Sequence, residues 1–167
     1  MKRLTTFLSL ALISILTSVT ALAVPSAALA KPIVAPGDPA LKQAFQAEQK
    51  WSNTQQDAIN KADKAASDVQ RVIDAASAEG RDVSALQNAL NAFNGALSSV
   101  KSEHQAAASL ISAHNGFDGS GEVTDRQSAR QTVLDIRTHL MQAHVTLIQA
   151  VHNLHKAVLD WRAATFG

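Results

Sequence analysis

Apolar residues recur at heptad spacing along the C-terminal part of the chain, from Thr124 to Ala164. The ladder that carries this pattern comprises Val133, Leu140, Leu147, Leu154 and Trp161. Met141, Ile148 and His155 widen it into an apolar arc on one side of a helix of about 40 residues. An isolated helix with such an arc exposed is unstable in water, so we expect the rest of the chain to cover it.

Two earlier segments also have the composition and punctuation of helices. Asp38-Pro39 pairs a residue suited to the N-cap with a proline at the first helical position. Gly80 is typical of a helix end, and Asp82 is typical of the cap of the next helix. The sequence therefore predicts a tight turn between two long helices.

The second of these helices has apolar positions that alternate in steps of three and four between Val83 and His114. Gly95 interrupts it, and we expect this glycine to permit the close approach of a neighbouring helix. For the third helix, Thr124 and Gln127 have the spacing of a capping box, with Thr124 as the N-cap.

These patterns predict an all-α fold. We expect an elongated antiparallel up-down-up three-helix bundle over residues 38–167, with helices at about 39–79, 83–114 and 125–165. A longer coiled-coil or swapped dimer is the alternative, since strict heptads also suit partner helices.

The N-terminal residues 1–23 have the features of a secretory signal peptide. Lys2 and Arg3 precede an apolar run, and Ala23 or Ala30 ends a small-x-small cleavage motif. Residues 24–37 hold three prolines and mostly small side chains, so we interpret them as a flexible Pro/Ala-rich linker. We therefore expect a secreted or periplasmic protein that has no membrane contact after cleavage.

Composition narrows the function classes further. The chain has no cysteine, which excludes disulfides, thiolate metal sites and cysteine nucleophiles. Without Lys2 and Arg3 its 15 basic residues become 13, against 14 acidic ones, so a basic surface for nucleic acid is not expected. Neither a nucleophile elbow nor a phosphate-binding loop is present, and we expect a protein that is not an enzyme and binds no cofactor.

Histidine is the chemically suggestive residue type, with six copies. If the helices pair antiparallel about the two turns, His104 comes level with Asp57 and Asp135, and His114 comes level with Glu48. Imidazoles and carboxylates on facing helices can hold a metal ion, so these five residues form the candidate metal site.

Each histidine also has a simpler interpretation. Gln55 could satisfy His104 by a hydrogen bond, in a polar layer that fixes the helix register. His152 and His155 lie one turn apart and favour a solvated pair. The loop from Asp118 to Val123 resembles part of a calcium-binding EF-hand, but Gly116 and Gln127 stand where that loop needs acids, so an interhelical turn is favoured.

Three stretches carry a family resemblance. They are Gly80–Leu86, the loop Gly116–Asp118 with Val123–Asp125, and Ala129–Val133 ahead of Trp161-Arg162. Over about residues 49–162 the chain resembles uncharacterised exported α-helical proteins of Chloroflexota-type bacteria. The resemblance implies export and an all-α fold, and it carries no activity or site residues.

Together these patterns indicate an exported, non-catalytic helical protein with a structural or protein-binding role at the extracytoplasmic face. We expect it to contact another protein, or a second copy, through its helix faces. A periplasmic metal-binding or metal-sensing bundle and an extracytoplasmic chaperone are the alternatives.

Overall fold

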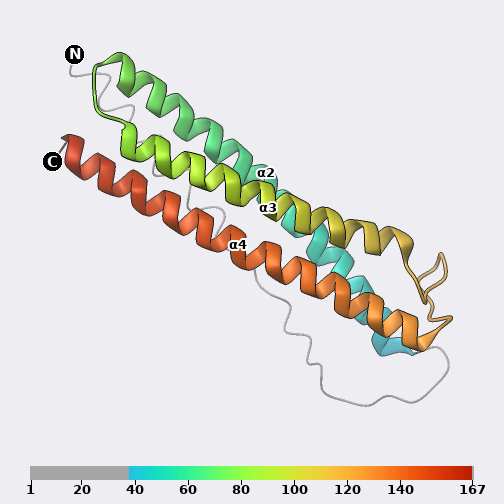
Figure 1. Ribbon diagram of the computed structural model, residues 1–167. Helices are drawn as coiled ribbons and strands as arrows, with labels where there is room; N and C mark the ends of the chain where they lie inside the picture. Colours follow the sequence, from blue (N-terminus) through green and yellow to red (C-terminus); the bar gives the residue numbers. More distant parts are fainter. Residues whose placement is uncertain (1–37, 167) are drawn as a thin grey trace. The chain divides into compact units, whose positions relative to one another are not determined.

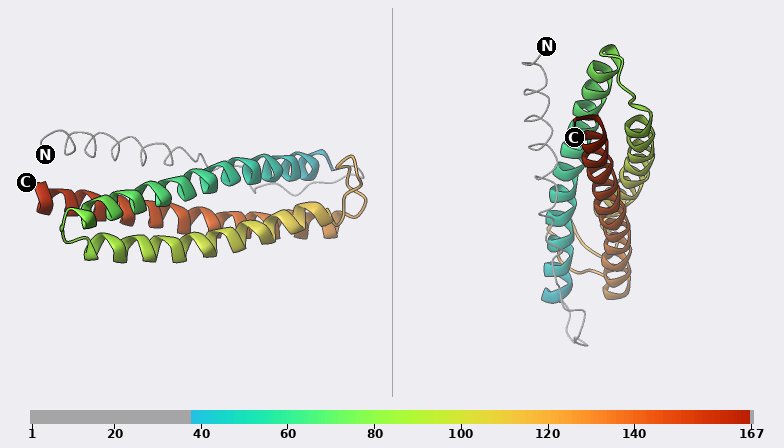
Figure 2. Two further views of the ribbon diagram at one scale, coloured as in Figure 1. Left: turned by 90° about the horizontal axis from the view of Figure 1, so that it is seen from above. Right: turned by 90° about the vertical axis from the view of Figure 1, so that its left-hand side faces the viewer.

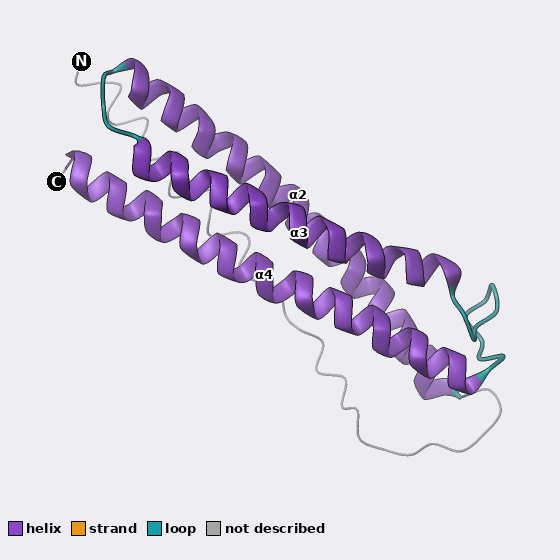
Figure 3. Ribbon diagram, in the orientation of Figure 1, coloured by secondary structure: helices purple, strands orange, loops and turns teal. Residues whose placement is uncertain are grey.

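The computed structural model of the chain describes residues 38–166, which form three α-helices (Figure 1). These are α2 (Pro39–Ala78), α3 (Ser84–Ala113) and α4 (Arg126–Phe166). Figure 3 shows helices joined by loops and, within this part of the chain, no strand. The all-α prediction is confirmed, and each helix end lies within one residue of the predicted position.

The expected signal peptide (1–23) and linker (24–37) lie outside the described residues. Among the helices that are described, none carries an apolar stretch long enough to cross a bilayer.

The first three predicted helix boundaries are confirmed by the local structure at each of them. Asp38 Oδ1 accepts from the backbone N–H groups of Ala40 and Leu41, at 3.1 and 3.3 Å. Gly80 ends the helical stretch with a positive φ of 76°, and Asp82 Oδ1 accepts from the N–H of Ser84 at 2.9 Å. Local capping chemistry therefore decides where α2 begins and ends and where α3 begins.

The predicted cap of α4 is wrong by one residue. Asp125, not Thr124, caps the helix: its Oδ1 accepts from the N–H groups of Gln127 at 2.9 Å and Ser128 at 3.1 Å. Thr124 instead donates its own N–H to the carbonyl of Gly116 at 2.9 Å, which holds it in the loop. The loop therefore shifts the start of the helix by one position.

The helices contribute to two compact units, and each helix passes through both. Unit 1 takes residues 58–100 and 145–166, and unit 2 takes residues 38–57 and 101–144 of the described chain. Within each unit, stretches of α2, α3 and α4 run side by side (Figures 1 and 2).

Unit 1 has an apolar core of alanine and branched aliphatic side chains. Its most deeply buried members are Ile59, Ala62, Leu86, Leu90, Val100, Leu147 and Leu154. At the first interhelical turn, Trp161 Nε1 donates to the carbonyl of Asp82 at 2.9 Å, and the Arg81 guanidinium lies 4.4 Å from the centre of the Phe166 ring. The end of α4 is thus fixed to the start of α3.

Unit 2 has a more aromatic core, which includes a residue from the second loop. Phe117 stacks on Phe45 with ring centres 4.3 Å apart. The other buried members are Trp51, Ala107, Ala129, Val133, Ile136 and Leu140. The loop is therefore an integral part of this core.

Two expectations about packing are corrected by the structure. A Cβ added at Gly95 would meet nothing within 4 Å, so this glycine does not serve a close helix contact. The apolar arc of α4 is also covered only in part. Its heptad ladder is buried, whereas Met141 and Ile148 remain 40% and 45% exposed. The neighbouring helices cover the centre of the arc and leave one side open.

Candidate functional site

Unit 2 encloses a group of polar side chains that we call the polar cluster: Glu48, Gln55, His104, Arg137 and His144. All three helices contribute to it, two residues from α2, one from α3 and two from α4. Four of the five are buried, with at most 8% of their surface exposed, and Arg137 is half-buried. Buried polar groups are costly unless they are hydrogen-bonded, so their partners show what the cluster does.

Glu48 and Arg137 form the charged half of the cluster. Arg137 donates from Nε to the carboxylate oxygen Oε1 at 2.7 Å, and its Nη2 makes an ion-pair contact with the same oxygen at 2.5 Å. The Glu48 side chain is fully buried, while 16% of the Arg137 side chain remains exposed. Burial raises the pKa of Glu48 above its usual 4.5, and the hydrogen bond and charge of Arg137 oppose that rise.

Gln55 and His104 form the neutral half. Gln55 donates from Nε2 to the backbone carbonyl of Leu140 at 2.9 Å, and its Oε1 lies 3.2 Å from His104 Nδ1. Because an amide oxygen only accepts, this contact places the imidazole proton on Nδ1. Burial lowers the pKa of His104, so the ring is held neutral. Gln55 thereby links α3 to α4.

His144 and Trp51 close the cluster with an edge-to-face contact. Their ring centres lie 6.1 Å apart at an interplanar angle of 69°. Three buried atoms of this region lack a hydrogen-bond partner in the described structure: Glu48 Oε2, Trp51 Nε1 and His144 Nδ1. Burial also lowers the pKa of His144.

The structure does not bring the five candidate metal ligands together, and four of them have separate partners. His104 contacts Gln55 as the simpler interpretation expected, and Glu48 contacts Arg137 rather than His114. The others are placed as follows: His114 Nδ1 contacts the carbonyl of Ser112, Asp135 accepts from Gln131, and Asp57 is exposed. No three His, Asp or Glu groups of the described residues gather in a way that could hold a metal ion. The metal site stays a prediction.

Arg137 is the functional residue that the sequence reasoning missed. Counting residues from a turn predicts which positions of two helices joined by that turn lie side by side. Glu48 and Arg137 lie on α2 and α4, which no single turn connects. A detectable signal was present: Glu48 occupies an inward heptad position, and a buried carboxylate needs a cation. Arg137 lies beside the buried Ile136 on the predicted third helix.

The loop between α3 and α4 is a compact turn. Its contacts are those of an interhelical turn and not those of a calcium-binding loop. Asp118 Oδ1 accepts from the hydroxyl of Ser120 at 2.7 Å and from the N–H groups of Glu122 at 2.9 Å and Ser120 at 2.8 Å, and these hydrogen bonds lower the pKa of the Asp118 carboxyl. Phe117 and Val123 pair as an isolated β-bridge. The polar groups of this loop therefore hold the turn itself.

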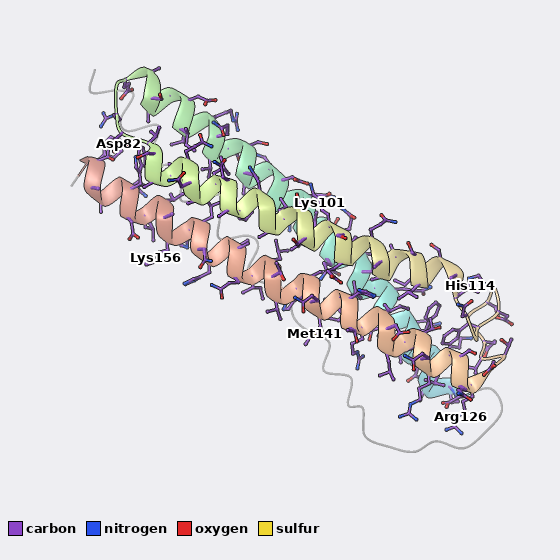
Figure 4. The ribbon with its side chains drawn as sticks, in the orientation of Figure 1. Asp82, Lys101, His114, Arg126, Met141 and Lys156 are labelled. Atoms are coloured by element: carbon purple, nitrogen blue, oxygen red, sulfur yellow. The ribbon has the colours of Figure 1, made fainter. Side chains whose placement is uncertain are left out.

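The outer side of α4 is the main apolar surface. All the large hydrophobic side chains that are exposed in the described structure belong to this helix: Met141, Val145, Ile148, Leu159 and Phe166. His152 and His155 are exposed on the same side. In Figure 4 the Met141 side chain extends from α4 away from the ribbon of α3. We call the surface from Met141 to Leu159 the outer face of α4.

Two surface hollows occur in unit 1. A groove of about 400 Å³ lies between α3 and α4, where small residues such as Ala89, Ala92 and Ala96 face Val145 and Ala150. A more open hollow at the first turn is lined by Asp74, Arg81 and Asp82 among others. There the Arg81 guanidinium contacts the Phe166 ring, and Asp82 accepts a hydrogen bond from Ser84. We therefore interpret this hollow as a consequence of the turn.

Comparisons with known proteins add no family: no family model, curated protein or solved structure matches the chain. The resemblance to exported helical proteins of Chloroflexota-type bacteria stays a prediction.

Proposed function

We propose that the chain is an exported, non-catalytic helical protein with a structural or protein-binding role at the extracytoplasmic face. The observation that carries this proposal is the outer face of α4, where exposed Met141, Val145, Ile148 and Leu159 follow one another along one helix. Contiguous exposed apolar residues are typical of protein interaction sites. An amphipathic helix presents its anchors in this way to a partner helix or groove.

The polar cluster has a structural part in this proposal. A buried ion pair contributes little net stability, but a mispaired one is very costly, so such groups can fix the register of packed helices. Glu48–Arg137 and Gln55–Leu140 both join α2 to α4 within unit 2. The antiparallel up-down-up order predicted from the sequence belongs to the same proposal. The short turn at 79–83 and the Trp161–Asp82 hydrogen bond of unit 1 support it.

An extracytoplasmic chaperone is the second candidate, because the same exposed face could hold unfolded segments of many clients. The two candidates differ in their partners. A dedicated binding protein contacts one or a few partners of defined mass, whereas a chaperone contacts a range of chains.

A photo-crosslinking amino acid introduced at Ile148 in the producing cell tests the proposal. The matched control is Asn153, which is exposed on the same helix but off the outer face. We expect adducts of discrete mass from position 148 and none from position 153. A continuous range of adducts at 148 would favour the chaperone, and equal yields at both positions would contradict a specific binding role. Fractionation and the N-terminal sequence of the purified protein test export.

A further inference from the structure

The outer face of α4 has the spacing of a coiled-coil seam. Met141, Val145, Ile148, His152, His155 and Leu159 follow one another in alternating steps of four and three residues. All six are exposed, and α4 is one uninterrupted helix over this stretch. The heptad ladder that packs into the cores lies on another side of the helix. The helix therefore carries a second seam that its own neighbours do not cover.

We propose that this seam binds the α4 helix of a second copy of the chain in an antiparallel coiled coil centred on Ala150. The inference rests on the proposed protein-binding role and names its partner. In this register Met141 faces Leu159 of the second copy, Val145 faces its His155, and Ile148 faces its His152. With Met141 as heptad position d, every layer joins a d residue to an a residue, as antiparallel coiled-coil packing requires.

The charges along the seam suit a second copy. From Thr138 to Trp161 the helix carries two charged side chains, Lys156 and Asp160, which pair with each other at 2.5 Å. No like charges are brought together at the centre of the pairing. At each end, Arg162 comes level with Thr138 of the other copy, where Arg137 is already paired with Glu48 and Asp135 lies about one turn away, so no unpaired like charge faces it. A face shaped for an acidic or basic partner would carry a charge of one sign.

The antiparallel direction follows from the two histidines. A parallel pairing would stack His152 on His152 and His155 on His155, and would align the two helix dipoles. The antiparallel pairing places each imidazole against an aliphatic side chain and opposes the dipoles. The seam from Met141 to Leu159 spans about 27 Å, so the dimer should be weak and should depend on protein concentration.

Sedimentation velocity of the protein purified from cells that express the whole 167-residue chain tests association. We expect a monomer–dimer equilibrium between about 5 and 500 µM, a range suited to a small interface. Ile148→Glu should raise the dimer Kd roughly 100-fold, because each interface then contains two buried charges without partners. Asn153→Glu adds the same charge to an exposed position of the same helix, heptad position b, which lies off the seam, and should leave the Kd unchanged. Circular dichroism verifies that both variants are folded.

Cysteine crosslinking tests the register, since the natural chain has no cysteine. Val145→Cys and His155→Cys should form little disulfide alone and should crosslink rapidly when mixed, because these positions face each other only in the antiparallel pairing. Crosslinking of Val145→Cys with itself at the rate of the mixture would overturn the antiparallel arrangement.

The outcomes separate this inference from the proposed function. A protein that stays monomeric at all concentrations, or a dimer that Ile148→Glu does not weaken, overturns the second copy as partner. If Ile148 then still crosslinks in the cell to a different protein of discrete mass, the protein-binding role stands without self-association. If neither association nor a specific crosslink is found, both proposals fail.

Discussion

At the residue scale, the pair Glu48–Arg137 combines a large desolvation cost with one hydrogen bond and one ion-pair contact to the same oxygen. Arg137→Ala leaves a buried carboxylate without its cation, and we expect a loss of about 3 kcal/mol in the free energy of unfolding. Urea denaturation followed by circular dichroism measures it. Lys156→Ala, which removes the exposed pair with Asp160, should change stability by less than about 0.5 kcal/mol.

Replacing both partners distinguishes the cost of a broken pair from the contribution of the intact one. Glu48→Leu combined with Arg137→Leu removes the charge together with its counter-charge, so the double variant should be much more stable than Arg137→Ala alone. A double variant as unstable as the single one would show that the Arg137 side chain acts through packing and not through its charge.

Stability should also depend on pH through His104 and His144. Burial lowers the pKa of both rings below the usual 6.5, so the unfolded chain takes up protons first as the pH falls. The free energy of unfolding should therefore decrease as the pH drops below about 6.5, and thermal unfolding between about pH 7.5 and 5.5 should show a falling Tm. His104→Gln keeps a polar side chain but cannot titrate, and the slope should become shallower.

Glu48 acts in the opposite direction. Its pKa is raised above 4.5, so the folded state keeps its proton to higher pH than the unfolded chain does. The stability that this gives is complete below pH 4.5 and is lost as the pH rises through the folded-state pKa. Glu48→Gln should remove this contribution while leaving the histidine effect in place. In the Glu48→Gln variant, a Tm that rises on acidification from neutral pH would contradict the assignment of neutral buried histidines.

At the scale of the elements, two glycines with different environments give a matched test. Gly116 has a φ of 83°, and a Cβ added there would lie 2.1 Å from the backbone nitrogen of Ala129. Gly116→Ala should therefore destabilise unit 2 by about 3 kcal/mol or more. Gly95 lies within α3 with open space around it, so Gly95→Ala should stabilise the protein by about 0.5–1 kcal/mol. Thermal and urea unfolding of both variants measure the difference. If Gly95→Ala instead lowered the stability, the result would support the close helix contact expected from the sequence.

The helices could be predicted because their signals are local. Asp38-Pro39 and Gly80 act on backbone groups a few residues away, so their effect does not depend on how the rest of the chain packs. The cap of α4 was misassigned because a contact from Gly116, eight residues earlier, holds Thr124 in the loop. Capping rules contain no information about such contacts.

The candidate site was harder to predict than the helices. Register across a turn follows from counting residues, which correctly brought Gln55 near His104. Register between α2 and α4 depends on the lengths of both turns and all three helices, so the partner of Glu48 was not found. The exposed side of the α4 arc was missed for a related reason: heptad spacing shows that a face suits packing, but not whether the chain itself supplies the partner.

At the scale of the whole molecule, the two interpretations of its histidines differ in their response to metal. Glu48 is engaged by Arg137 and His104 by Gln55, so binding an ion there would require both contacts to break. We expect Zn²⁺, Ni²⁺, Cu²⁺ or Ca²⁺, added one at a time after chelator treatment, to leave the Tm unchanged at low protein concentration. A metal that bound only the folded state would add RT ln(1 + [L]/Kd), about 2.7 kcal/mol at 100 times its Kd.

The residues that abolish a metal response would identify its origin. A rise in Tm that is lost on His104→Ala would support the metal-binding alternative and would mean that the polar cluster rearranges around the ion. A rise that is lost only on His152→Ala or His155→Ala would place the ion on the outer face of α4. In that case the effect should grow with protein concentration, because the antiparallel pairing brings His152 of the two copies within about one turn of each other. Metal dependence and self-association would then have one cause, and disrupting the seam with Ile148→Glu should remove both.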